Sequence, residues 1–184
     1  SRLSPAMQKN SGARFFTPFF IVSEQSHREY WLIHLSMHER ARDEMTKLHW
    51  ALQNQFRHNG GAGLNMFGYD PRKDDGLSGQ EAFKDFDFDD AARARTESQL
   101  RVDIPEELNR YPEGVSLAKL VSETVNTTPA HTEMYKDALG YFLDDKNIVI
   151  VSPDGERRRK GQRVGSKDII TVAKQTTLFF RKRF

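Results

Sequence analysis

Two short apolar runs, separated by an arginine-rich turn, constrain the fold of this 184-residue chain more than any other feature. The runs are IVIVS (148–152) and DIITVA (168–173), and the sequence Pro153-Asp154-Gly155 after the first run favours a turn. Three segments with helical character precede them, at 104–111, 116–126 and 127–147. Three helices followed by a strand hairpin is the layout of a winged helix-turn-helix. We therefore predict such a domain over residues 101–184.

The boundaries of the three helices follow from proline positions and apolar spacing. Pro105 fits the first turn of the first helix. The apolar residues of the second helix share one face: Leu117, Leu120, Val121 and Val125. In the third helix Thr128 is a good N-cap and Pro129 fits the first helical position. The connection NTTPA between these two helices is short enough for the tight turn that the motif needs.

An aromatic β-hairpin and an amphipathic helix are expected within residues 1–60. The two runs of the hairpin, 15–23 and 30–36, are apolar nearly throughout and flank the polar sequence EQSHRE. The next helix carries an apolar stripe at three- and four-residue spacing: Met37, Ala41, Met45, Leu48, Leu52 and Phe56. Residues 61–100 are first rich in glycine and then acidic, and we expect a linker there. The predicted fold class is α+β.

Positive charge gathers toward the C-terminal end of the chain. From Lys146 to Phe184 there are 11 Lys or Arg against three acids, an imbalance that is typical of proteins with a polyanion partner. The wing would supply cations that pair with phosphate oxygens: Arg157, Arg158, Arg159, Lys160 and Arg163. The third helix, as recognition helix, would expose hydrogen-bonding side chains: Thr128, His131, Thr132, Tyr135 and Lys136. Glu133 and Asp137 oppose a phosphate surface, and this helix has no arginine to bind guanine.

Patterns of catalytic and metal-binding residues are missing from the sequence. The chain has no cysteine, which excludes disulfides, thiolate zinc sites and a cysteine nucleophile. His34 and His38 are four residues apart, but one lies in a predicted strand and the other at a helix start, so helical metal-ligand spacing does not apply. The motif DFDFDD (85–90) is interpreted as an acidic loop anchored by phenylalanines. We expect no metal, no cofactor and no catalytic activity in this chain on its own.

The sequence also bears on membranes and location. No run approaches the roughly 18 to 20 apolar residues of a membrane span. The segment SRLSPAMQKNSG lacks the apolar centre of a signal peptide. We therefore expect no membrane contact and a cytoplasmic location.

One segment is similar to a known family. The run YWLIHLSMHERARDEMTKLHW (30–50) resembles the end of the methyltransferase-like region in the three-Cys-motif partner proteins, where a winged helix also follows. The resemblance implies that the hairpin from Phe15 to Ser36 forms the last, antiparallel strands of a Rossmann-like sheet, so that residues 1–60 are the tail of that region. This chain lacks the Gly-rich strand-to-helix turn that would bind S-adenosylmethionine, and the resemblance carries over no catalytic residue.

Three functions remain open at this point. The first is a winged-helix module of a methyltransferase-like partner protein that binds nucleic acid, with duplex DNA as the expected partner. The second is a protein-interaction module that docks onto a partner enzyme. The third is the C-terminal part of an S-adenosylmethionine-dependent methyltransferase.

Overall fold

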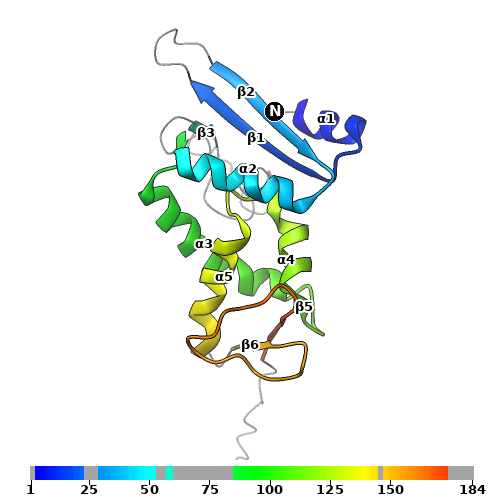
Figure 1. Ribbon diagram of the computed structural model, residues 1–184, viewed down its shortest axis with the longest axis vertical. Helices are drawn as coiled ribbons and strands as arrows, with labels where there is room; N and C mark the ends of the chain where they lie inside the picture. The colour runs from blue at the N-terminus through cyan, green and yellow to red at the C-terminus, as the bar shows by residue number, and fades with distance from the viewer. Residues whose placement is uncertain (1–2, 23–28, 53–56, 60–84, 145–146, 174–184) are drawn as a thin grey trace, which may run out of the picture.

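The computed structural model describes residues 3–22, 29–52, 57–59, 85–144 and 147–173 (Figure 1). Most of the expected linker lies outside these residues. Two sheets are present within them, one near each end of the molecule, with helices between them.

The first sheet is built on the expected hairpin. Strand β1 (Phe15–Val22) pairs with β2 (Glu29–Ser36) along its whole length, with Phe15 opposite Ser36 and Val22 opposite Glu29. The short strands β3 (Arg57–Asn59) and β4 (Asp85–Asp87) extend the sheet in the order β2-β1-β3-β4. Helix α1 (Leu3–Ser11) lies beside the hairpin (Figure 1). Every strand pair described in this sheet is antiparallel, so these residues show no Rossmann-like arrangement.

Helix α2 (Glu39–Leu52) confirms the expected helix, but the prediction of its buried face is wrong. Two residues of the apolar stripe are exposed, Met37 by 63% and Leu48 by 50%. The buried side is mostly polar instead: Arg42, Asp43, Thr46, His49 and Trp50. The physical reason is that this side faces backbone groups of another segment, which require hydrogen-bond donors and acceptors.

The second half of the chain has the connectivity of a winged helix. Its elements are α3 (Asp90–Leu108), β5 (Val115–Ser116), α4 (Leu117–Thr124), a 3₁₀ turn (Val125–Thr127), α5 (Thr132–Tyr141), a second 3₁₀ turn (Phe142–Asp144), β6 (Ile148–Val151) and β7 (Ile169–Val172). The three strands form a sheet in the order β5-β7-β6, in which both pairs are antiparallel. The predicted strands at 148–152 and 168–173 are confirmed, and the two-residue strand β5 was not foreseen.

Helix α3 corrects the first of the three predicted helices. The short helix expected at 104–111 is the last part of a 19-residue helix that begins at Asp90, inside the range expected to be linker. Asp89 caps it, since its carboxylate accepts a hydrogen bond of 2.6 Å from the backbone N–H of Ala92. Pro105 therefore lies inside the helix and not in its first turn. The helix continues because one face stays buried through residues Ala92, Thr96, Leu100, Ile104 and Leu108.

The two halves share one hydrophobic core. Phe15, Trp50 and Phe88 belong to the same buried cluster as the residues of α4 and α5. The rings of Trp50 and Phe88 meet edge to face with their centres 4.8 Å apart. Helix α2 thus packs directly against the winged helix.

Candidate nucleic-acid interface

The wing is the loop from Ser152 to Asp168, and an ion pair between the half-buried Arg158 and the buried Asp168 holds its base. The carboxylate of Asp168, which is 1% exposed, accepts hydrogen bonds from Nε and Nη2 of Arg158 at 2.7 and 2.9 Å. The backbone N–H of Gly165 donates to the same carboxylate at 2.8 Å. The hydrogen bonds from Arg158 hold the pKa of Asp168 below its ordinary value. Arg158 therefore anchors the loop, a role that the sequence did not indicate.

The other predicted cations of the wing are exposed, and Arg163 and Lys160 form ion pairs with acidic residues. Arg163 Nη2 lies 2.6 Å from the carboxylate of Glu133 in α5, and Lys160 Nζ lies 3.1 Å from that of Asp144. Arg157 is exposed on the same loop.

Two further cations lie on the wing. Arg159 and Lys167 are exposed, and within the described part of the chain their side chains form no ion pair. Lys167 was not among the predicted residues, although it lies in the same basic stretch of the sequence.

The predicted residues of the recognition helix are mostly turned inward. Thr128 and Tyr135 are 0% exposed and His131 is 6% exposed, so the expectation that they lie on the surface is wrong. Thr128 and His131 lie in the buried turn before α5, which begins at Thr132 and not at Pro129. Tyr135 lies on the buried face of α5 together with Ala138 and Leu139. Lys136 is half-buried and donates to Glu133 at 2.8 Å.

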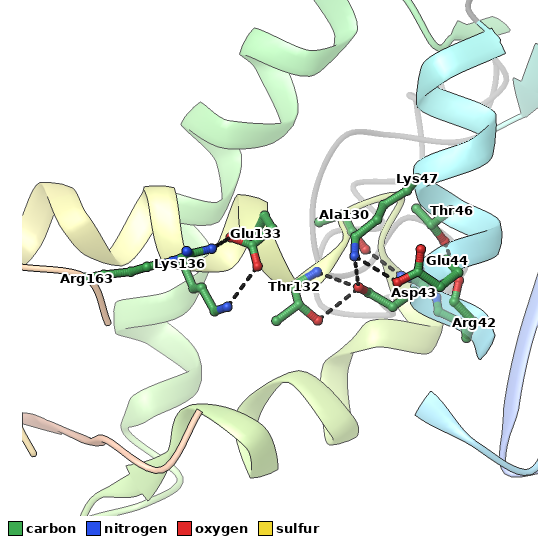
Figure 2. A network of polar contacts seen from close by, with 10 residues as sticks. All are labelled: Arg42, Asp43, Glu44, Thr46, Lys47, Ala130, Thr132, Glu133, Lys136 and Arg163. Carbon is green, nitrogen blue, oxygen red and sulfur yellow. Dashed lines mark hydrogen bonds and ion pairs between the residues drawn. The ribbon is translucent and has the colours of Figure 1, made fainter. Parts of the chain in front are cut away.

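Helix α2 contacts the turn before α5 and the first residue of α5 through Arg42, Asp43 and Trp50, of which Figure 2 shows the first two. Arg42 donates from Nη1 to the carbonyl of Ala130 and from Nη2 to that of Thr128, at 2.5 Å each. Trp50 Nε1 donates to the carbonyl of Pro129 at 2.8 Å. Three successive carbonyls of the turn are thereby satisfied by one helix. Burial lowers the pKa of Arg42 to about 10, so the guanidinium stays charged at neutral pH.

Asp43 caps α5 from the same helix. Its Oδ1 accepts a hydrogen bond from the backbone N–H of Thr132 at 2.6 Å and one from the Thr132 hydroxyl at 2.9 Å. Lys47 Nζ lies 2.9 Å from the other carboxylate oxygen. Burial would raise the pKa of Asp43, but the hydrogen bonds from Thr132 and Lys47 outweigh it and lower the pKa below its ordinary value. We call the contact of Arg42, Asp43 and Trp50 with residues 128–132 the turn clamp.

A comparison with protein families supports the winged helix. Residues 68–155 match the model of the GMT-like wHTH domain, where wHTH denotes a winged helix-turn-helix. The chain contains a winged helix-turn-helix domain. No curated protein and no solved structure matches the chain. The family match does not extend to residues 1–67, so the resemblance of the N-terminal part to the three-Cys-motif partner proteins stays a prediction.

A shallow groove lies between α5 and the wing of the winged helix-turn-helix. It has a volume of about 330 Å³ and is lined by Glu133, Lys136, Asp137, Gly140, Leu143 and residues 161–164. Acidic and basic side chains alternate in it, so it does not form a surface of one sign.

In the ranges that the structure describes, no group of three or more His, Cys, Asp or Glu side chains could hold a metal ion. No helix among those residues is long and apolar enough to cross a membrane.

Proposed function

We propose that this chain is a DNA-binding module whose wing contacts the phosphate backbone of a duplex. The observation that carries the proposal is a set of exposed cations on a loop whose base is fixed by the Arg158–Asp168 pair. Winged helix-turn-helix domains commonly bind nucleic acid. Contacts to phosphate require only well-placed cations, whereas sequence recognition requires contacts to the bases.

The charge and the order of the loop both support this proposal. From Pro153 to Lys167 the sequence has six Lys or Arg and two acids. Because the loop is already held by hydrogen bonds at Ile150, Ser152 and Asp168, less conformational entropy is lost when its cations meet phosphate. Arg159 and Lys167 are the cations best placed for that contact, since neither has an acidic partner among the residues that the structure describes.

The test is the salt dependence of duplex binding, measured by fluorescence anisotropy. The double variant R159A/K167A should lower affinity roughly tenfold at low salt and reduce the slope of log K against log salt by about two, one for each lost phosphate contact. The matched control is K9A/R40A, which removes one Lys and one Arg at exposed positions of α1 and α2, in the half of the molecule that lies away from the wing (Figure 1). If both double variants bind alike, or if the unaltered chain does not bind duplex DNA, the proposed function is wrong.

A second candidate function, docking of a protein partner, is favoured by the outer side of α2. Leu48 on this helix and Met37, two residues before its start, are exposed although both are large and apolar. A partner that uses this side should co-purify with the unaltered chain from its native host and be lost with L48D. The same variant should keep its affinity for duplex DNA, because the wing is unchanged.

A further inference from the structure

The turn clamp occupies the part of a helix-turn-helix that ordinarily meets DNA. In that motif the N-terminal residues of the recognition helix contact base edges in the major groove. Here the first turn of α5 is met by α2 of the same chain, and the backbone N–H of Thr132 already donates to Asp43. The N-terminal end of a helix can also bind a phosphate group. Here the carboxylate of Asp43 occupies the position that a phosphate would take. Arg42 is 0% exposed, so its side chain is fully enclosed where α2 meets the turn.

The rest of α5 offers little that could distinguish bases. Apart from Thr132, whose hydroxyl donates to Asp43, its residues outside the core are Glu133, Lys136, Asp137, Gly140 and Tyr141. Glu133 binds both Lys136 and Arg163, so the only lysine of this surface is neutralised by its neighbour. Asp137 would approach DNA with a negative charge, and Gly140 has no side chain. Bidentate contacts from Arg, Asn or Gln, which distinguish guanine and adenine, have no counterpart in α5.

We infer that α2 takes the place of nucleic acid at the recognition helix, so that this winged helix-turn-helix binds duplex DNA through its wing and does not read base sequence. The inference rests on the proposed function and names its ligand class: duplex DNA of any sequence. Arg42 and Asp43 determine this loss of specificity, because they hold α2 over the first turn of α5. The wing remains accessible because Arg159 and Lys167 are exposed and take no part in the turn clamp, although Arg163 of the same loop reaches Glu133 in the first turn of α5.

Two binding measurements on the full chain test the inference. In the first, unlabelled duplexes of equal length and composition but shuffled sequence compete with a labelled duplex. In the second, the cytosines of one duplex carry glucosylated 5-hydroxymethyl groups, which fill the major groove and leave the phosphates unchanged. We expect all affinities to agree within about fivefold, whereas a protein that reads bases loses about 5- to 150-fold for each wrong base pair. A larger spread among sequences, or a larger loss on the modified duplex, overturns the inference and leaves the proposed function intact.

A residue-level measurement separates the two surfaces. In NMR spectra recorded during addition of duplex DNA, the backbone amide resonances of Arg159 and Lys167 should shift. The amide resonance of Thr132 should not shift, because its N–H still donates to Asp43. Shifts of Thr132 as large as those of the wing would overturn the inference. If no duplex of any sequence binds, the proposed function fails, and the inference fails with it.

Discussion

Replacement of Arg42 by methionine should destabilise the chain more than any surface substitution. The guanidinium is fully buried and donates to the carbonyls of Thr128 and Ala130, residues that are themselves 0% exposed. Methionine fills a similar volume but leaves both carbonyls without a donor, at about 1 to 3 kcal/mol for each. Part of this loss is offset because a charge no longer has to be buried. We expect the free energy of unfolding to fall by about 3 kcal/mol.

The assay is equilibrium unfolding in urea, followed by tryptophan fluorescence. The control is R40M, which makes the same substitution at an exposed position of α2 and should change the free energy of unfolding by at most about 0.5 kcal/mol. R42K should lie between the two, because one ammonium group cannot bind two carbonyls in the fork geometry of a guanidinium. If R42M and R40M unfold at the same urea concentration with the same slope, the turn clamp contributes nothing to stability and our reasoning is refuted.

Three further predictions concern pH, glycine and the wing. Burial lowers the pKa of His131 to about 4, so as the pH falls this histidine is protonated in the unfolded chain before it is protonated in the folded one. The free energy of unfolding should therefore fall by about 3 kcal/mol between about pH 6.5 and pH 4. Urea unfolding at several pH values should show a flatter decline for H131N. G114A should lower the free energy of unfolding by about 2 to 4 kcal/mol, since φ is +86° and the new Cβ would lie 2.8 Å from Ile169 Cγ2. G155A has a similar φ of +85° but nothing within 4 Å of its new Cβ, so it should lower the free energy by only about 1 kcal/mol. Thermal unfolding of both variants measures the difference. D168N should speed amide hydrogen exchange in the wing more than in α5, because it removes the carboxylate that holds the loop; equal exchange in both would contradict that role.

The winged helix was predictable from the sequence because its signals are local. Apolar spacing in α4 and the two runs around the wing are each contained in a short window. The start of α5 was not predictable in this way. Thr128 and Pro129 form a good local start for a helix, but Arg42, Asp43 and Trp50, far earlier in the sequence, bind the backbone of residues 128–132 and delay the helix until Thr132.

The buried face of α2 shows a second limit of pattern analysis. A stripe of apolar residues is assumed to face the core because cores are usually lined by side chains. The surface that α2 covers is lined by the carbonyls of residues 128–130 and the N–H of Thr132, which only polar side chains can satisfy. Nothing in the α2 sequence itself indicates which of its two faces meets such a surface.

The signs of the two charges in the turn clamp match the ends of the helices that they meet. Arg42 donates to the carbonyl of Thr128, the C-cap of the 3₁₀ turn after α4, where helix dipoles leave partial negative charge. Asp43, the next residue, accepts from the first N–H of α5, where they leave partial positive charge. Two adjacent residues of one helix thus complement both ends of the helix-turn-helix turn. A bound phosphate could complement only the second of these ends, so α2 complements this turn more fully than a phosphate group would, in keeping with the proposal that a duplex contacts the wing alone.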